Sequence, residues 1–218
     1  MLSCFAHTRS KLVASDHLRV RFGAITREFG VVDPLQGEVG DLFDQTFACA
    51  NSDAQYRSNR LQPGALPIEW SFSETELDAL RFEFQPFDPT LAGEERRRRT
   101  VGVVARIVEG YHNSDLAERF KLAVQSVSAE EPTLNFGAFV GLVQRPRCKY
   151  EFKIYVECDP KDPMLSTREL SNIAGAAPHF VSVSVGASAV SQRIYYICRD
   201  GLRTMDLEAV CAALGMSH

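Results

Sequence analysis

Apolar and polar residues alternate along several short segments of the chain, and this period of two predicts β-strands with one apolar face. The first two strands are predicted over Pro67 to Ser73 and Leu80 to Gln85, with Glu74 to Ala79 as their connection. Ile68 and Trp70 share the apolar face of the first strand, so Trp70 is expected in the core. Together the two segments predict a β-hairpin.

The same alternation returns twice further along the chain. Asn135 to Val143 and Glu151 to Cys158 predict a second strand pair, and Phe180 to Gly186 with Gln192 to Cys198 predict a third. The strands of each pair follow one another closely in sequence, so they are expected to pair in antiparallel fashion.

Helical periodicity fills much of the remaining sequence. Helices are predicted over Glu94 to Gly110 and Ser114 to Val127, and a closing amphipathic helix is predicted over Thr204 to Leu214. Ser166 to Glu169 has the capping-box form S-x-x-E and predicts a helix that reaches about Ala176.

The first part of the chain is less regular. Asp41 to Ala50 predicts a helix, whereas Asn51 to Gly64 is polar and predicts a loop. Ser15 to Phe29 also predicts a helix, although the alternation within residues 18–22 is compatible with a strand.

These elements predict one α+β domain over residues 1–218, in which helices alternate with strand pairs. Residues 1–64 form a helical N-terminal segment and a loop, and residues 66–214 carry three strand-pair repeats. Because each strand has only one apolar face, the helices are expected to cover one face of an antiparallel sheet.

The other face of this sheet is predicted to be polar, and two interpretations of it remain open. An antiparallel sheet often exposes one face to water. Alternatively, the sheet curls into a partial barrel with the helices outside, and the polar face lines a lumen. The polar-face residues are Glu69, Arg81, Glu83, Gln85, Glu151, Lys153, Tyr155, Glu157, Arg193 and Tyr195.

The second strand of each pair carries one cation on the polar face: Arg81, Lys153 or Arg193. Tyr155 and Tyr195 each follow a cation by two residues, and the strand period places both members of each pair on the same face. Cations neutralise a diphosphate and phenol hydroxyls add directed hydrogen bonds, so this arrangement favours a lumen that binds such a ligand.

Composition narrows the class of protein. Of the 218 residues 45% are apolar, which is enough for a sizeable core, and the net charge of −4 gives no indication of nucleic-acid binding. No apolar stretch reaches the roughly 18 residues that a membrane helix needs, and Met1 to Asp16 lacks the apolar block of a signal peptide. We therefore expect a cytoplasmic protein without a membrane partner.

Several residue types are given structural roles rather than functional ones. None of the six cysteines forms a C-x-x-C pair and the five histidines lack ligand spacing, so reduced thiols and no His-bound metal are expected. Arg96 to Arg99 is a run of four arginines, which usually lies on a solvated helix face.

Three passages of this sequence resemble the ABBA-barrel (αββα, or PT-barrel) prenyltransferases. Leu66 to Ser71 (LPIEWS) followed by Leu80 to Pro86 (LRFEFQP) is similar to the first hairpin of the fungal indole and cyanobactin peptide prenyltransferases. Tyr150 to Pro160 contains the family's Lys-x-Tyr strand as KIY, and Ser191 to Asp200 (SQRIYYICRD) resembles a later repeat of the peptide-modifying branch.

The resemblance implies a role for each cation and tyrosine of the polar face. Arg81, Lys153 and Arg193 would bind the diphosphate of an allylic donor. Tyr155 and Tyr195 would shield the allylic cation after the diphosphate leaves, because the face of an aromatic ring attracts a cation.

The resemblance also implies a transferase in natural product biosynthesis, which moves a dimethylallyl or geranyl group to an aromatic small molecule or a peptide. Glu69 would hydrogen-bond or deprotonate that acceptor. No cofactor is required, although in metal-using members this glutamate helps to place Mg²⁺.

The chain departs from the family in length. The family has about ten strands, and roughly eight are needed to enclose a small ligand, whereas three strand pairs give six. The chain is then a short form, and a homodimer is one way to complete the barrel. The alternatives are an incomplete barrel that serves as a non-catalytic ligand- or protein-binding module, and a plain sandwich whose cations pair with Glu83, Glu151 and Glu157.

Overall fold

A computed structural model of the chain describes residues 20–28, 30, 37–46, 68–73, 76–127, 134–145, 151–158 and 176–198. Residues 20–28 are helical, and the other described helices are α2 (Gly37–Gln45), α4 (Gly93–Tyr111) and α5 (Ser114–Gln125). The strands are β1 (Ile68–Ser73), β2 (Glu76–Phe84), β3 (Ala138–Gln144), β4 (Glu151–Glu157), β5 (Ala176–Val185) and β6 (Val190–Cys198).

The six strands form one antiparallel sheet in which spatial order follows chain order, from β1 to β6. Each strand pairs with the next one along the chain, so the sheet is a meander. Among the described strands β1 and β6 are the two edges, and the sheet is open. The coarse expectation of an α+β fold with antiparallel strand pairs is therefore confirmed.

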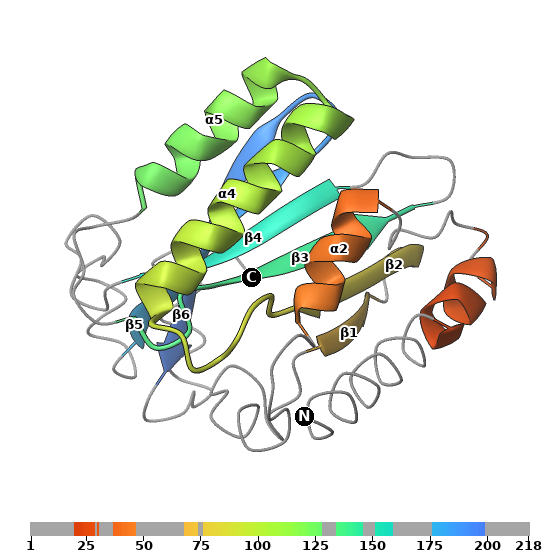
Figure 1. Cartoon of the computed structure of the whole chain (residues 1–218), viewed down its shortest axis with the longest axis horizontal. Coiled ribbons are helices and arrows are strands. Elements are labelled where there is room, and N and C mark those ends of the chain that lie inside the picture. Colours follow the sequence, from red (N-terminus) through yellow and green to blue (C-terminus); the bar gives the residue numbers. More distant parts are fainter. Residues whose placement is uncertain are drawn as a thin grey trace, which may run out of the picture.

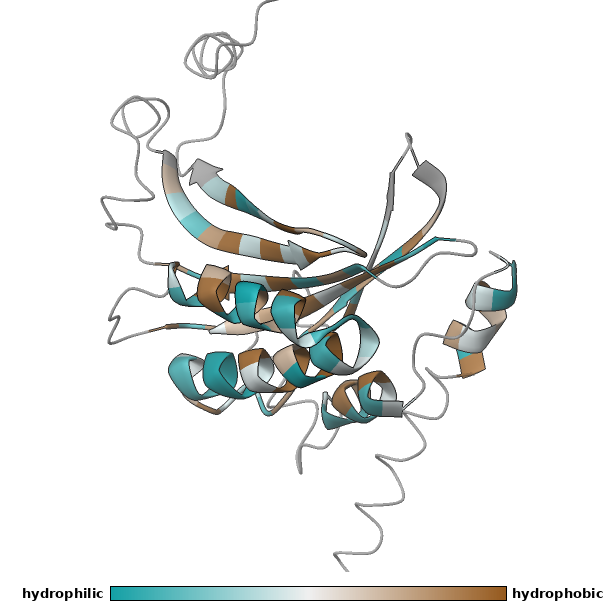
Figure 2. Ribbon diagram, turned by 90° about the horizontal axis from the view of Figure 1, so that it is seen from above, coloured by the Kyte–Doolittle hydropathy of each residue, from teal (hydrophilic) through white to brown (hydrophobic). Residues whose placement is uncertain are grey.

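Helices α2, α4 and α5 lie over one face of the sheet, as Figure 1 shows from the helical side. Helix α4 packs on β3 and β4, and α5 packs on β5 and β6. Figure 2 shows that the sheet is strongly curved and that the described helices stand on one side of it. This arrangement agrees with the predicted two layers.

The strand register aligns large apolar side chains on the face that meets the helices. Phe82, Leu142 and Phe152 occupy one row across β2, β3 and β4, and all three are almost fully buried. Val104 and Phe120 of the helices belong to the same core cluster. Burial of each such side chain contributes about 1.5–3 kcal/mol, so this row and its neighbours fix which face turns inward.

Most predicted strands are confirmed, with shifted ends. The second strand starts at Glu76 rather than Leu80, and the third covers Ala138 to Gln144 rather than starting at Asn135. Strand β5 begins at Ala176, which the capping-box prediction placed in a helix. That prediction is wrong at this residue, because Ala176 pairs with Cys198 of β6.

The helix predictions are confirmed for α4 and α5, while α2 starts at Gly37 instead of Asp41. Residues 20–22 are helical, so the strand alternative is wrong there. One turn of this helix directs Phe22 and Thr26 into the interior, and the Phe22 ring lies 4.5 Å from that of Phe82. The predicted segments 51–64, 166–175 and 204–214, and the side chain of Trp70, lie outside the described part.

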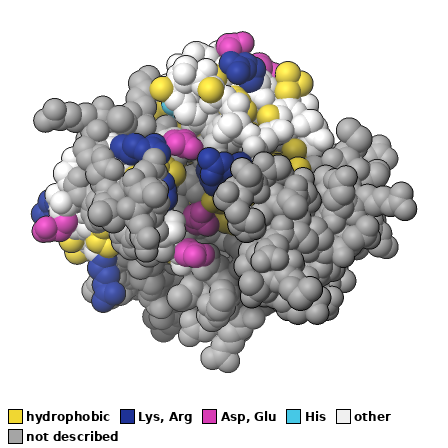
Figure 3. Space-filling view, turned by 180° about the vertical axis from the view of Figure 1, so that it is seen from behind, with side chains coloured by type: hydrophobic (Ala, Val, Ile, Leu, Met, Phe, Trp, Pro, Cys, Tyr) yellow, Lys and Arg dark blue, Asp and Glu magenta, His cyan; other side chains and the backbone are white. Residues whose placement is uncertain are grey.

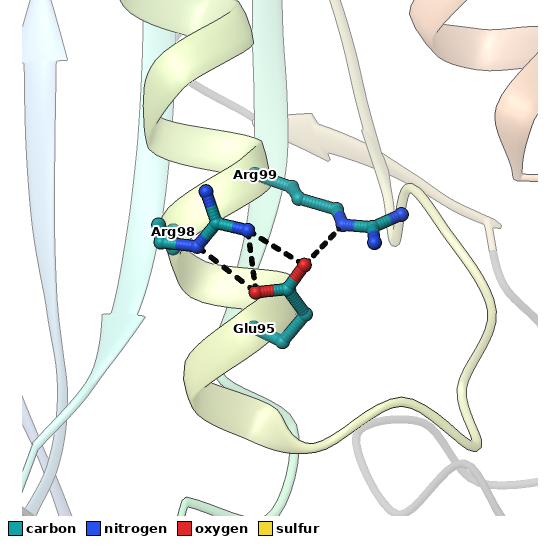
Figure 4. Close-up of polar contacts among 3 residues, drawn as sticks. All are labelled: Glu95, Arg98 and Arg99. Carbon is teal, nitrogen blue, oxygen red and sulfur yellow. Dashed lines mark hydrogen bonds and ion pairs between the residues drawn. The ribbon is translucent and has the colours of Figure 1, made fainter.

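The arginine run divides into two environments. Arg98 and Arg99 are exposed and pair with Glu95 one turn earlier, both at 2.6 Å (Figure 4). Arg96 is instead buried, and its Nη2 donates to the backbone oxygen of Asn135 at 2.6 Å. The predicted solvated face is confirmed for Arg98 and Arg99 and wrong for Arg96. No described helix has the length and apolar character to cross a membrane.

Candidate functional site

The sheet face opposite the helices carries a hollow of about 460 Å³, and Figure 3 views the molecule from this side. Its floor and walls come from β1 to β6, so it lies across the width of the sheet. The charged side chains that line it are Arg81, Glu83, Arg145, Glu151, Lys153 and Arg193. Four cations and two carboxylates give the hollow a surplus of two positive charges when all six groups are ionised.

The register explains why these side chains meet. Glu83, Gly141, Lys153 and Ser184 form one row across β2, β3, β4 and β5 on the polar face. Gly141 lies between the two charged residues and has no side chain, which leaves space above the strand. A Cβ atom at Gly141 would lie 3.2 Å from Cε2 of Tyr155, so the ring already occupies the nearest space. Gly141 thus lines the hollow, and a side chain at this position would crowd the Tyr155 ring.

Lys153 is held between two tyrosine rings. Its Nζ donates to the Tyr195 hydroxyl at 2.9 Å, and the same atom lies 4.7 Å from the ring centroid of Tyr155 and 5.5 Å from that of Tyr195. These distances fit cation–π contact with both rings. Partial burial opposes ionisation of the Tyr195 phenol, but the hydrogen bond and charge of Lys153, with smaller contributions from Ser182 and Arg193, lower the pKa of Tyr195 overall.

Tyr155 and Glu83 form a hydrogen-bonded pair at the wall of the hollow, in which the phenol donates to Oε1 of the carboxylate. Burial and the negative charge of Glu83 raise the pKa of Tyr155. Burial also raises the pKa of Glu83, and so does the negative charge of Glu69. The hydrogen bond from Tyr155 and the positive charge of Lys153 lower this pKa, but the net shift is upward. Glu83 is therefore more readily protonated than an ordinary glutamate.

Aromatic rings continue from Tyr155 along the same face. The Phe139 ring stacks on Tyr155 with centroids 4.2 Å apart, and the Phe180 ring stacks on Tyr195 at 4.6 Å. Tyr155 and Phe180 meet edge to face at 5.5 Å, so the four rings form one continuous cluster. The strand period predicted the two tyrosines but not Phe139 and Phe180. Phe139 lies opposite Tyr155 and Phe180 opposite Tyr195 in the strand register, and this polar-face position could have identified them.

The structure brings most of the predicted site residues together. Arg81, Lys153, Tyr155 and Arg193 line the hollow, and Tyr195 contacts Lys153. These residues come from three strands, β2, β4 and β6, that are not neighbours of one another.

Glu69, the predicted acceptor base, does not line the hollow. It lies on edge strand β1 with its side chain exposed, opposite Glu83 in the register. Glu83 is the carboxylate that reaches the hollow from this hairpin. Arg145, which the sequence analysis did not single out, also lines the hollow and lies 3.3 Å from Oε2 of Glu151.

Glu157 shares the polar face but has a structural role. Its Oε1 accepts hydrogen bonds from the backbone and side-chain amides of Asn135, both at 3.0 Å. Its Oε2 accepts from the backbone amides of Phe136 at 2.7 Å and Gly137 at 2.9 Å. The carboxylate thus anchors the loop that leads into β3. Gly137 has φ of 76°, and a Cβ there would lie 1.9 Å from the backbone oxygen of Gly93.

Across the residues that the structure describes, no group of three or more His, Cys, Asp or Glu side chains is arranged to hold a metal ion. Cys158 is buried. Comparison of the chain with protein-family models gives no match, and no curated protein sequence matches it.

Proposed function

We propose that the hollow binds the diphosphate of an allylic donor, dimethylallyl or geranyl diphosphate, and that the chain transfers the allylic group to an aromatic or peptide acceptor. The observation that supports this most strongly is that Arg81, Lys153 and Arg193 line a single hollow although they come from three separate strands. A surplus of cations around a confined space suits a compact polyanion, and arginine in particular matches phosphate oxygens in pairs.

The arrangement suits the chemistry of allylic transfer. The allylic C–O bond breaks, and its electron pair leaves with the diphosphate, whose added charge the cations stabilise. The rings of Tyr155 and Tyr195 flank Lys153, so they lie close to the place where the carbocation would form. The acceptor supplies the electron pair of the new bond and gives up a proton. The family resemblance suggests Glu69 as the base for this proton; since Glu69 lies exposed on edge strand β1 and not in the lining of the hollow, it could serve only an acceptor that extends to that edge.

The fold supports a short relative of the ABBA arrangement. Helices cover one face of the sheet and the polar face carries the hollow, which is the arrangement that the family resemblance implies. The sheet of the described strands is open. A second copy that pairs with an edge strand would complete a barrel.

A second candidate function is a non-catalytic binding module. The open edges of the sheet among the described strands favour it, because a wall left incomplete there would expose a carbocation to water. Such a module binds an anion in the same hollow but releases no product.

The first test is a calorimetric titration with dimethylallyl thiodiphosphate, a donor mimic that does not ionise. Arg81→Ala, Lys153→Ala and Arg193→Ala should each weaken binding by roughly tenfold to a hundredfold, since a hydrogen bond to a charged group contributes about 1.5–3 kcal/mol. Arg98→Ala is the matched control, because it removes an exposed guanidinium from α4 on the other face. An absence of binding, or equal losses in the control, would sink the diphosphate site.

A second test separates the enzyme from the binding module. The protein is incubated with dimethylallyl diphosphate and with L-tryptophan or a tyrosine-containing peptide, and products are followed by mass spectrometry. An acceptor that gains the mass of one dimethylallyl group in a Lys153-dependent manner supports the transferase. Tight thiodiphosphate binding without any transfer favours the module.

A further inference from the structure

We propose that Glu83 is an additional ligand-binding residue of the hollow, and that it holds the diphosphate as a neutral carboxylic acid, after taking up one proton when the diphosphate binds. The inference rests on the proposed function, because it requires a diphosphate in the hollow. It assigns to Glu83 a hydrogen bond donated to a phosphate oxygen, where an ionised carboxylate would repel the ligand.

The position of Glu83 makes this protonation necessary. The residue lines the hollow together with the cations that would bind the diphosphate, so a bound polyanion lies beside its carboxyl group. Two adjacent negative groups in a partly buried site cannot both ionise without a large cost, and the weaker acid takes up a proton. Oε1 already accepts a hydrogen bond from Tyr155, which leaves Oε2 as the atom that carries the proton.

Charges of opposite sign face Glu83 from the neighbouring strands before the ligand arrives. Glu69 of β1 opposes its ionisation, Lys153 of β4 favours it, and β3 contributes only Gly141 at the facing position. Burial outweighs the hydrogen bond from Tyr155, so the pKa of Glu83 is already raised in the free protein. The remaining charged groups around the hollow are Arg81, Arg145, Glu151 and Arg193.

The added charge of the ligand then decides the protonation state. An allylic diphosphate brings roughly two to three negative charges next to the carboxyl, and each acts in the same direction as Glu69 does. The proton that neutralises Glu83 comes from solvent, so binding and proton uptake are linked.

The test is calorimetric titration of dimethylallyl thiodiphosphate at pH 7 in two buffers with different ionisation enthalpies, PIPES and imidazole. The difference in apparent enthalpy gives the number of protons taken up. Wild-type protein should take up about one proton more than Glu83→Gln, whose amide resembles the neutral acid and can still accept the Tyr155 hydrogen bond. Proton exchange by the ligand itself cancels in this difference.

Affinity provides an independent measurement. Glu83→Gln should bind the thiodiphosphate about tenfold more tightly than wild type at pH 8, and the two should converge towards pH 5 as wild-type Glu83 becomes neutral. The matched control is Glu151→Gln, which removes the other carboxylate of the hollow. That variant should retain the proton uptake of the wild type.

The possible outcomes separate this inference from the proposed function. Equal proton uptake in wild type and Glu83→Gln, or weaker binding by Glu83→Gln at pH 8, overturns the role of Glu83 alone. If neither protein binds thiodiphosphate at any pH while both remain folded by circular dichroism, the diphosphate site and the role of Glu83 are both wrong.

Discussion

Replacing Glu157 by glutamine removes half of the hydrogen bonds that anchor the entry to β3. The carboxylate accepts four hydrogen bonds, two on each oxygen, from Asn135, Phe136 and Gly137. Glutamine keeps one oxygen and places an NH₂ group where the other oxygen was. Whichever way the glutamine amide turns, its NH₂ group faces two of the four N–H donors, and those two donors lose their acceptor.

The size of the effect follows from which donors lose their acceptor. The retained oxygen should face the buried backbone amides of Phe136 and Gly137, while the amides of the more exposed Asn135 turn to water. Loss of charge weakens the two bonds that remain. A hydrogen bond to a charged group contributes about 1.5–3 kcal/mol and a neutral one about 0.5–1.5 kcal/mol, so weakening the two buried bonds by about 1–1.5 kcal/mol each should lower the free energy of unfolding of Glu157→Gln by about 2–3 kcal/mol. That is a large part of the roughly 5–15 kcal/mol that a domain has.

Urea unfolding followed by circular dichroism measures this loss. Glu151→Gln is the matched control, because Glu151 lies on the same strand and pairs with Arg145 at 3.3 Å while about a third of each side chain is exposed. Such a pair contributes about 0–1 kcal/mol. If Glu157→Gln changes the free energy of unfolding by no more than about 0.5 kcal/mol, as ordinary surface substitutions do, the anchoring role is refuted.

The remaining predictions concern the hollow and the helical surface. The raised pKa of Glu83 means that the folded state binds this proton more tightly than the unfolded state, whose value is near 4.5. The contribution of Glu83 to stability is therefore greatest below pH 4.5 and is lost as pH rises through the folded pKa. Glu83→Gln should be more stable than wild type at pH 8 but not at pH 4, and an equal difference in free energy of unfolding between the two proteins at both pH values would contradict this. Gly141→Val should abolish thiodiphosphate binding with every charge retained, because even a Cβ would lie 3.2 Å from Tyr155; unchanged affinity in calorimetry would show that the ligand binds elsewhere. Glu95→Ala should leave both the unfolding midpoint and thiodiphosphate binding nearly unchanged, since its arginine partners are exposed; a clear fall in either would count against that assignment.

The strands could be predicted from sequence because their burial is one-sided. A period of two identifies the apolar face wherever a strand packs on helices, as in Phe152 and Ile154 of β4, which are both buried. The start of β5 could not be predicted in this way. Local capping favoured a helix up to Ala176, whereas pairing with β6 over the whole length of β5 determines the strand.

The helix at residues 20–28 shows the same limit. Alternation of apolar residues and arginines fits a strand, and only contacts distant in sequence distinguish the two. Phe22 packs against Phe43 and Phe82, with ring centroids 6.4 and 4.5 Å away. These contacts depend on where α2 and β2 lie in the fold, and the sequence pattern of residues 20–28 carries no information on those positions.

The candidate site was predictable in its residue types but not in its assembly. Strand period placed Arg81, Lys153 and Arg193 on one face, and the register then brings them to one hollow. Glu69 and Glu83 have the same periodic position within one hairpin, yet Glu69 lies on the edge strand and is exposed. Only strand order distinguishes them, and strand order is a property of the whole sheet.

A crystal structure of the chain with dimethylallyl thiodiphosphate would show whether the hollow on the polar face is a diphosphate site. We predict the diphosphate within hydrogen-bonding distance of Arg81, Lys153 and Arg193, with the allylic carbon beside the rings of Tyr155 and Tyr195. A diphosphate bound elsewhere on the protein, with no ligand in the hollow at saturating concentration, would rule out a diphosphate site in the hollow.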